Sequence, residues 1–209
     1  MKTCFIITAY IEGNLAGLVS SREPDYIICA DGGYELAVSQ GIVPDLVIGD
    51  SDSGAMSNIT GANTEFIHFP TEKDESDTFL CIKHALSLEC DEIVITGGIG
   101  GRLDHTISNI QTLACFANTS QRISVIDDKN YFTVIENSQI TLSGNIDMSV
   151  SIFSLTDTCT GVSTAGLYYP LDNAVLKSTY PVGLSNKFTG CSASIEVKKG
   201  KLLIVMSLE

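Results

Sequence analysis

Two aspartates stand two residues apart directly after a short apolar run, in the segment PDLVIGDSDS that begins at Pro44. Side chains of an extended segment alternate between two faces, so Asp50 and Asp52 leave the backbone on the same side. Carboxylates at this spacing can bind one hard divalent cation, and without a cation they repel each other. An ordinary solvated turn is the alternative, but a turn gains nothing from two like charges. The pattern favours a metal site.

A glycine pair follows another apolar run, in Asp31-Gly32-Gly33. Adjacent glycines permit a tight turn and a close approach of the backbone to a phosphate before a helix begins. The same tripeptide is also a common turn, and taken alone it favours the turn.

The segment PTEKDESD carries acidic residues at the expected start of a helix. Asp74 and Asp77 are three residues apart and project from one helix face, so Asp77 can join Asp50 and Asp52 at a metal. The alternative is that Asp74 caps the helix and that Glu75 and Asp77 complement the helix dipole. Lys73 is either a local counter-charge or a phosphate contact.

Four glycines within five residues, from Gly97 to Gly101, precede Arg102, Asp104 and His105. Backbone N–H groups of such a turn can bind phosphates, and Arg102 adds a fixed positive charge. The order of residues matches neither the Walker pattern nor the Gly-x-Gly-x-x-Gly pattern of dinucleotide folds. His105 by itself is better explained as a packing or capping residue than as a catalyst.

Short apolar runs alternate with segments of helical period in the first half, which is typical of an α/β fold with a doubly wound, mostly parallel sheet. Because the runs are continuously apolar, helices are expected on both faces of the sheet. The expected strands are residues 4–7, 26–30, 46–48, 66–69, 92–96 and 122–126, and the expected helices are residues 34–40, 76–89 and 103–117.

Ligands bind beyond the carboxyl ends of parallel strands, so the four polar turns described above are expected to meet at one edge of the sheet. Their aspartates, together with Lys73 and Arg102, predict a combined metal and phosphate site. Such a site is typical of phosphoryl or pyrophosphoryl transfer, in which the protein mainly positions the reactants and neutralises charge.

The second half is rich in Ser, Thr and Gly and contains short alternating segments, among them residues 148–153, 193–198 and 202–206. Short, closely spaced strands between turn residues are typical of an antiparallel sandwich or barrel. We therefore predict an α/β domain over residues 1–136 and a smaller antiparallel β-sandwich or barrel-like domain over residues 137–209.

The formal net charge of −13 is concentrated in the first half. Residues 1–105 hold 17 acidic and 5 basic side chains, whereas residues 106–209 hold 8 and 7. No basic stripe is present to neutralise a phosphate backbone, which argues against nucleic acid as a partner. No apolar run reaches the roughly 18 residues of a membrane span, and no cleavage site follows the N-terminus, so we expect no membrane association and a cytoplasmic location.

Seven cysteines without a Cys-x-x-Cys spacing disfavour both a disulfide framework and a zinc site. We expect them to be small buried apolar side chains.

Taken in chain order, the polar turns resemble the signature of the thiamine pyrophosphokinase (thiamine diphosphokinase) family, and a later segment is similar to that family's thiamine-side motif. The matching residues are Asp31-Gly32-Gly33, Pro44-Asp45 with Gly49-Asp50-Ser51-Asp52-Ser53, Lys73-Asp74-x-x-Asp77, Gly100-Gly101-Arg102-x-Asp104-His105 and Gly183-Leu184-Ser185-Asn186. The resemblance covers almost the whole chain. Lys187 departs from it, because bacterial relatives often carry an acidic residue there, and the chain has no Trp to stack on thiamine.

The resemblance implies transfer of the terminal diphosphate of ATP to the hydroxyl of thiamine, giving AMP and thiamine diphosphate. It implies that Asp50, Asp52 and Asp77 are catalytic and hold Mg2+. It assigns ATP binding to Asp31, Gly32, Gly33, Lys73, Asp74, Gly100, Gly101, Arg102 and Asp104, and thiamine binding to Ser185 and Asn186. Family members are homodimers with thiamine between the subunits, so active sites at the subunit interface are also implied.

Two other functions fit parts of the pattern. An aspartyl-phosphate phosphatase also carries an Asp-x-Asp pair after an apolar strand, with Asp50 as the nucleophile, but it leaves the glycine turns without a role. The second alternative function is a regulator that binds a nucleotide without turnover. Nucleotide binding alone does not require so many carboxylates.

Overall fold

The computed structural model of the chain describes residues 1–11, 13–50 and 64–208. Asp52, one of the three predicted metal ligands, lies outside the described residues. The chain divides into two compact units, residues 1–109 with 120–128 and residues 110–119 with 129–209. The domain limits of 1–136 and 137–209 stay a prediction.

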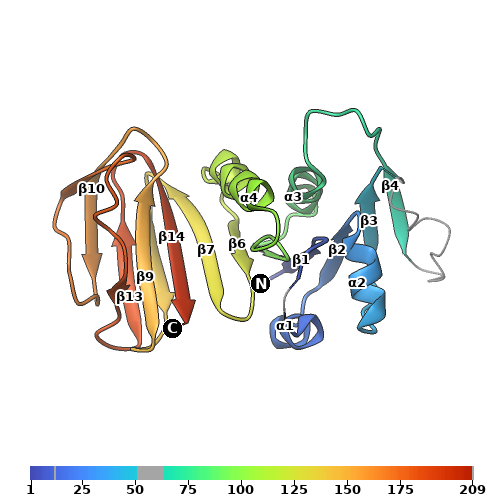
Figure 1. Ribbon diagram of the computed structural model, residues 1–209, viewed down its shortest axis with the longest axis horizontal. Coiled ribbons are helices and arrows are strands. Elements are labelled where there is room, and N and C mark those ends of the chain that lie inside the picture. Colours follow the sequence, from blue (N-terminus) through green and yellow to red (C-terminus); the bar gives the residue numbers. More distant parts are fainter. Residues whose placement is uncertain (12, 51–63, 209) are drawn as a thin grey trace. The chain divides into compact units, whose positions relative to one another are not determined.

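Within the described part of the first unit, a parallel sheet has the strand order β6-β5-β1-β2-β3-β4 (Figure 1). Strand β1 pairs in parallel with β5 on one side and with β2 on the other. All five residues of β1 are buried, as expected for the central strand of a sheet covered on both faces. The strands are β1 (Thr3–Ile7), β2 (Tyr26–Ala30), β3 (Leu46–Gly49), β4 (Glu65–His68), β5 (Glu92–Thr96) and β6 (Arg122–Ile126).

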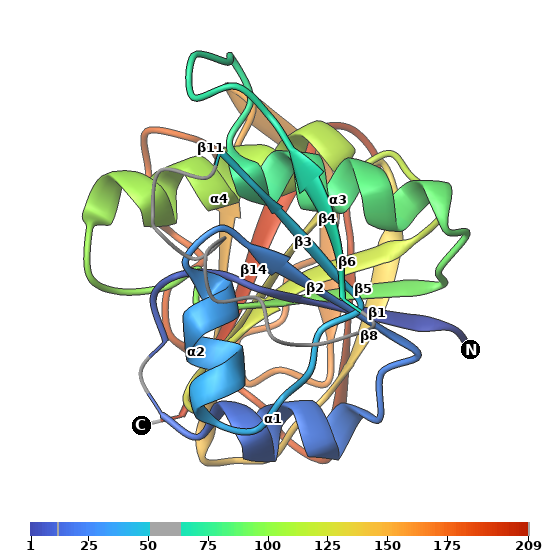
Figure 2. The same ribbon diagram turned by 90° about the vertical axis from the view of Figure 1, so that its right-hand side faces the viewer.

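Helices lie on both faces of this sheet, which confirms the predicted α/β class. Figures 1 and 2 show α1 (Leu15–Arg22) and α2 (Gly33–Ser39) on one face and α3 (Asp77–Ser87) on the other. A fourth helix, α4 (Leu103–Phe116), follows β5. The sequence pattern missed α1, although the side chain of Asn14 caps it by accepting a hydrogen bond of 2.9 Å from the backbone N–H of Gly17.

The second unit contains two antiparallel layers, with strand orders β12-β9-β14-β7 and β11-β10-β13-β8 among its described strands. The first layer comprises β7 (Asn130–Glu136), β9 (Met148–Ser154), β12 (Asn186–Lys187) and β14 (Lys201–Leu208). The second comprises β8 (Gln139–Ser143), β10 (Thr158–Ala165), β11 (Ala174–Lys177) and β13 (Ser192–Glu196).

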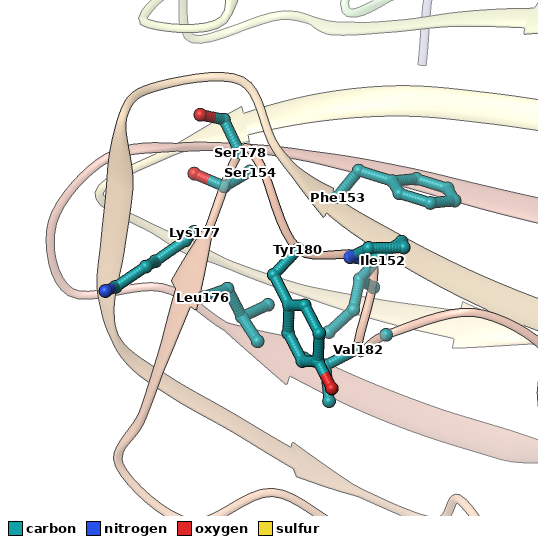
Figure 3. A pocket seen from close by; sticks show the side chains of 10 residues that line it. Ile152, Phe153, Ser154, Leu176, Lys177, Ser178, Tyr180 and Val182 are labelled. Carbon is teal, nitrogen blue, oxygen red and sulfur yellow. The ribbon is translucent and has the colours of Figure 1, made fainter.

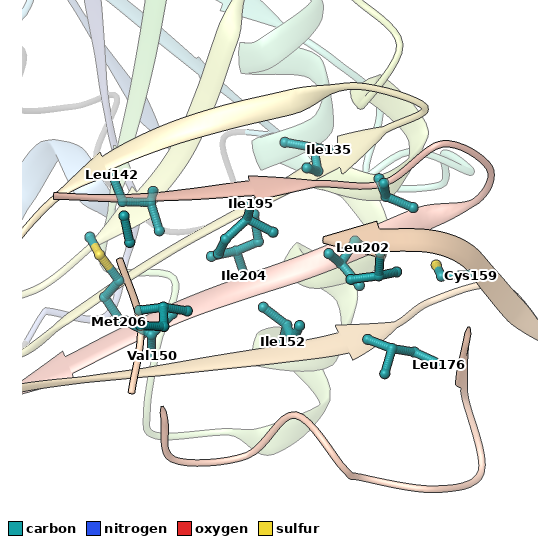
Figure 4. Close-up of a cluster of buried hydrophobic side chains, with 14 of the residues drawn as sticks. Ile135, Leu142, Val150, Ile152, Cys159, Leu176, Ile195, Leu202, Ile204 and Met206 are labelled. Carbon is teal, nitrogen blue, oxygen red and sulfur yellow. The ribbon is translucent and has the colours of Figure 1, made fainter. Parts of the chain in front are cut away.

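Alternating side chains from these layers form one hydrophobic core (Figure 4). Val150 and Ile152 enter it from β9, and Leu202 and Ile204 enter it from β14. Ile195, which is fully buried, comes from β13 in the other layer. Because inward and outward residues alternate with period two along each strand, this core confirms the antiparallel β architecture predicted for the second half.

Five of the seven cysteines are buried, as the sequence predicts, but Cys115 and Cys191 are exposed. All seven are free thiols. Among the described helices, none is long and apolar enough to cross a membrane. The cytoplasmic location stays a prediction.

Alkylation of the native chain at about pH 8 is expected to modify Cys115 and Cys191 first, because the thiolate is the reacting form and both side chains are exposed. Cys29 is expected to react only after unfolding, since burial raises the pKa of its thiol to about 12. Peptide mass spectrometry after a short iodoacetamide pulse measures the order, with a denatured sample as the control. Native modification of Cys29 at the rate of Cys191 would contradict its buried position.

Candidate active site

The strand order places a topological switch at the carboxyl end of β1. Since β2 and β5 lie on opposite sides of β1, the segments that follow these strands diverge and leave a crevice, which is where open α/β sheets bind ligands. Thr8, the first residue after β1, links the ends of β1 and β5 by hydrogen bonds. Its backbone N–H donates to the carbonyl of Thr96 over 3.0 Å, and its hydroxyl donates to the same oxygen over 3.1 Å.

A cavity of about 440 Å³ lies at this crevice, within the size range of small-molecule sites. Its walls come from the end of β2, the segments after β1, β2 and β5, the start of α3 and the first two turns of α4. The lining residues are Thr8, Ala9, Tyr10, Ala30, Asp31, Ser76, Asp77, Thr78, Gly97, Gly98, Gly100, Arg102, His105 and Asn109.

Sequence reasoning found some of these residues and missed others. The cavity brings together the predicted site residues Asp31, Asp77, Gly100 and Arg102. The segment after β1 was missed, although it follows an apolar run as the other predicted turns do, and the same rule of strand ends identifies it.

Asp31 and Asp50 follow neighbouring strands. In the parallel pair of β2 and β3, Ala30 is opposite Ile48, so the two chains reach the sheet edge together. A Cβ added to Gly49 would lie 3.1 Å from Oδ1 of Asp31, which shows how closely the Asp31 carboxylate approaches the residue before Asp50. Asp50 itself is half-buried at the end of β3.

The glycines after Asp31 serve packing in this structure. Gly32 occupies the N-cap position of α2, and Gly33 begins the helix. A Cβ on Gly33 would collide with the backbone carbonyl of Ile7, so only glycine lets α2 begin this close to β1. The buried position of Gly33 is therefore explained without a phosphate.

Helix α3 begins at Asp77 because Ser76 caps it. The Ser76 hydroxyl oxygen accepts a hydrogen bond of 3.2 Å from the backbone N–H of Phe79, so the alternative that Asp74 caps this helix is wrong. Asp74 is exposed in the segment before the helix.

The carboxylate of Asp77 is directed toward the ammonium group of Lys73. Its Oδ1 atom lies 2.7 Å from Nζ of Lys73. The same oxygen is buried, so the Lys73 ammonium occupies it in a close ion pair. A carboxylate has two oxygens, so Asp77 keeps acceptor capacity beyond its contact with Lys73.

The predicted metal site is only partly described. Among the described residues, no group of three or more His, Cys, Asp or Glu side chains lies close enough to hold a metal ion. Of the predicted carboxylates, Asp50 and Asp77 are described and Asp52 lies outside the described residues. The three-carboxylate site therefore stays a prediction.

Arg102 and Asp104 form a two-bond ion pair at the start of α4. Nε of Arg102 donates to Oδ1 of Asp104 over 3.2 Å, and one terminal nitrogen donates to Oδ2 over 2.6 Å. The hydrogen bond from Arg102 holds the pKa of the Asp104 carboxyl below its ordinary value, and the same bond raises the pKa of Arg102. Both side chains are exposed, so the guanidinium keeps its charge and is oriented at the rim of the cavity.

The glycine turn before α4 is held from two sides. The buried side chain of Asn109 donates from Nδ2 to the carbonyl of Gly98 over 3.0 Å. The ring of Tyr10 packs against Gly100 and Gly101, since a Cβ added to either glycine would lie 2.9 Å from a ring atom. Neither Asn109 nor Tyr10 was identified from the sequence.

The predicted thiamine residues lie in the second unit. Ser185 has a left-handed backbone with φ of 57°, and its N–H donates to the hydroxyl of Ser151 over 3.0 Å. The amide of Asn186 is bound to the main chain of Tyr169: Nδ2 donates to the Tyr169 carbonyl over 2.7 Å, and Oδ1 accepts from the Tyr169 N–H over 3.0 Å. In this structure Asn186 holds the segment that contains Tyr169.

Two small cavities border this region. One of about 90 Å³ is lined by Asn186 and Tyr169, and one of about 40 Å³ is bordered by Tyr180 and Val182 (Figure 3). Both are far below the roughly 300 Å³ of a typical small-molecule site. Neither cavity alone encloses a ligand the size of a vitamin.

The pKa of Asp104 is expected to lie below 3.8 in the wild-type chain and to return toward that value in Arg102→Ala. Because the folded-state pKa is lowered, the ion pair is intact above that pKa and is lost as the pH falls through it. An NMR titration of the Asp104 carboxyl carbon measures the shift, with Arg22→Ala as a control that removes an arginine from α1 instead. An unchanged pKa in Arg102→Ala would contradict the pair.

Comparisons with known proteins add independent findings. Residues 20–125 match the family model "Thiamin pyrophosphokinase, catalytic domain", and residues 137–202 match "Thiamin pyrophosphokinase, vitamin B1 binding domain". The chain is 27% identical to Thiamin pyrophosphokinase 1 of Caenorhabditis elegans, over 97% of this chain and 88% of the relative. It is 26% identical to Thiamine pyrophosphokinase of Bacillus subtilis, over the whole length of both chains.

The fold is similar to a crystal structure of thiamine pyrophosphokinase from Bacillus subtilis, with a TM-score of 0.86, 24% identity and full coverage of both chains. The cavity lies within the part of the chain that matches the catalytic model, apart from the segment after β1, and Ser185 and Asn186 lie within the match to the vitamin-binding model. The two family models together span most of the chain, which therefore belongs to the thiamin pyrophosphokinase family of transferases.

Proposed function

We propose that this chain transfers the terminal diphosphate of ATP to the hydroxyl of thiamine and releases AMP and thiamine diphosphate. The observation that carries the proposal is the cavity of about 440 Å³ at the switch point, which combines a glycine turn, Arg102 and the carboxylates of Asp31 and Asp77. Family membership supports the diphosphotransferase over the phosphatase and over a regulator without turnover.

The polyphosphate of ATP is the ligand group that fits the charged rim of this cavity. Arg102 presents a guanidinium whose planar donors suit phosphate oxygens, and Asp104 holds that guanidinium in one orientation before the nucleotide binds. Lys73 supplies a second positive charge beside Asp77. In the acidic first half of the chain, these two cations offset the repulsion between phosphates and the surrounding carboxylates.

The carboxylate set fits Mg2+. A hard cation prefers carboxylate oxygens, and the carboxylate of Asp77 borders the cavity. Asp50, Asp52 and Asp77 would hold the ion. When bound, Mg2+ would neutralise charge on the phosphates of the nucleotide. The ammonium group of Lys73 would then offset the part of the negative charge of Asp77 that the metal ion does not neutralise.

In the reaction, the hydroxyl oxygen of thiamine forms a bond to the β-phosphorus of ATP. The bond between that phosphorus and the oxygen shared with the α-phosphorus breaks, AMP leaves with that oxygen, and the hydroxyl proton passes to solvent. The contribution of the chain is to position the two substrates in line and to stabilise the charge of the leaving group. Arg102 and the N–H groups of the glycine turn provide that stabilisation.

We assign thiamine to the region around Ser185 and Asn186 and propose that the active form is a homodimer. The small size of the two cavities there supports a site that a second subunit completes. The amide of Asn186 holds the segment of Tyr168 and Tyr169 in place by two hydrogen bonds to the main chain of Tyr169. Both tyrosine rings are exposed and could contact thiamine or a second subunit. These rings are in edge-to-face contact, with centroids 4.9 Å apart.

Incubation of the purified chain with ATP, Mg2+ and thiamine is expected to yield AMP and thiamine diphosphate in equal amounts. Removal of Mg2+ with EDTA is expected to stop the reaction, since the acidic site then repels the nucleotide. Chromatography of both products measures the stoichiometry, and a reaction without thiamine is the control. Release of ADP, or a phospho-aspartate trapped at Asp50, would contradict the proposal.

Asp77→Asn is expected to lower kcat by at least about 100-fold, since even the outer partners of metal ligands cost about 10- to 100-fold when removed. The fold should be kept because the change is isosteric and Asp77 is only half-buried, so the loss of its ion pair with Lys73 costs little stability. Glu75→Gln is the matched control: Glu75 is exposed and lies 3.5 Å from Lys83. Kinetics over a range of Mg2+ concentrations and thermal unfolding measure both effects. Full activity of Asp77→Asn would refute the metal assignment.

A further inference from the structure

Asn109 is a buried polar side chain that has no place in the function described so far. It lies on α4, is 7% exposed and lines the cavity. Its amide Nδ2 donates to the carbonyl of Gly98 over 3.0 Å, so the second turn of the helix is joined to the glycine turn eleven residues earlier. A buried amide that is bonded to one peptide group fixes the orientation of that peptide. The bond therefore determines where the Gly98 carbonyl points.

The turn over residues 97–102 offers backbone donors that the protein does not use. Among the described residues, none accepts a hydrogen bond from the N–H groups of this turn. Most residues of the turn border the cavity, namely Gly97, Gly98, Gly100 and Arg102. Backbone N–H groups without an acceptor in the protein are suited to the oxygens of an anion. The backbone of this wall can therefore receive a phosphate, provided that its carbonyl groups face elsewhere.

A carbonyl that faced the cavity would have the opposite effect, because its partial negative charge repels a phosphate. The peptide between Gly98 and Ile99 is trans, so its C=O and N–H point in opposite directions. While Asn109 holds the carbonyl, that N–H is directed away from the Asn109 amide. Gly98 makes room for the contact, since a Cβ there would lie 2.9 Å from Nδ2 of Asn109. The hydrogen bond therefore requires glycine at position 98.

We propose that Asn109 is a positioning residue for the phosphate chain of the nucleotide. By holding the Gly98 carbonyl, it removes an acceptor from the cavity wall and leaves the N–H groups of the turn to meet the phosphate oxygens. The inference rests on the proposed function, and it adds a reason why a turn in the acidic half of the chain can receive an anion. In this assignment Asn109 acts through Gly98 rather than by contact with the nucleotide.

Asn109→Ala removes the donor to Gly98. It is expected to weaken the binding of inorganic tripolyphosphate, measured by calorimetry with Mg2+, roughly 3- to 10-fold, the effect of one lost hydrogen bond. Thr112→Ala is the matched control: it shortens another buried polar side chain of α4, and the described lining of the cavity does not include Thr112. Thermal unfolding checks that both variants fold. A loss in Asn109→Ala no larger than in Thr112→Ala, or no binding to the wild type, would overturn the proposal.

Gly98→Ala tests the same contact from the other side and provides a second measurement if Asn109→Ala does not fold. The added methyl group displaces the Asn109 amide, so tripolyphosphate binding is expected to weaken as in Asn109→Ala. In the Asn109→Ala background the methyl group meets Cγ1 of Val125 at 3.1 Å, which a small shift relieves, and little further loss is expected. Unchanged binding in Gly98→Ala, or additive losses in the double variant, would contradict a role of Asn109 through Gly98.

Steady-state kinetics distinguish this inference from the proposed function. If the wild type forms AMP and Asn109→Ala raises KM for ATP but not for thiamine, both are supported. If the wild type forms AMP but Asn109→Ala raises both KM values equally or neither of them, the function stands and the assignment of Asn109 to the phosphates is wrong. If the wild type forms no AMP, the function fails, while the tripolyphosphate experiments still test Asn109.

Discussion

Parallel pairing of β1 with β5 on one side and β2 on the other is the constraint on which the whole site depends. The register aligns Ile7 with both Cys29 and Thr96, so three strands end at the same edge. The connections must then leave in opposite directions, because β2 and β5 lie on opposite sides of β1. The space between them is the cavity, and Thr8, which lines it, donates two hydrogen bonds to the carbonyl of Thr96.

Glycines at this edge serve the protein's own packing. Gly33 lets α2 begin against the backbone of Ile7, and Gly100 with Gly101 accommodates the ring of Tyr10. A glycine-rich turn in a sequence suggests direct contact between backbone and phosphate, but the space that a Cβ would take is filled here by other parts of the chain. Any phosphate contact at these turns therefore comes from N–H groups, and the missing side chains serve the shape of the wall.

Charge in the site is arranged in pairs. Arg102 is held by Asp104 over two hydrogen bonds, and Lys73 lies against Asp77. Each cation thus has a carboxylate that fixes its position, which costs less on ligand binding than ordering a flexible side chain. The second unit uses neutral contacts for the same purpose, since the amide of Asn186 holds the main chain of Tyr169.

The order of polar turns after apolar runs was enough to predict the α/β class, the antiparallel second half and the family, because each depends on local patterns along the chain. It was also enough to select Asp31, Asp77 and Arg102 as site residues. Local patterns did not reveal α1, whose residues include Gly17 and two serines, or the N-cap of α3 at Ser76.

The sequence by itself thus determined which types of residue follow each strand and hence the chemistry available to the chain. Only the tertiary structure decided that Tyr10 and Asn109 form the cavity with them, and that Asp104 forms a hydrogen bond with Arg102. The reason is physical: these contacts arise from strand order and register, which join residues far apart in the chain, and from side-chain rotamers, which local sequence does not specify.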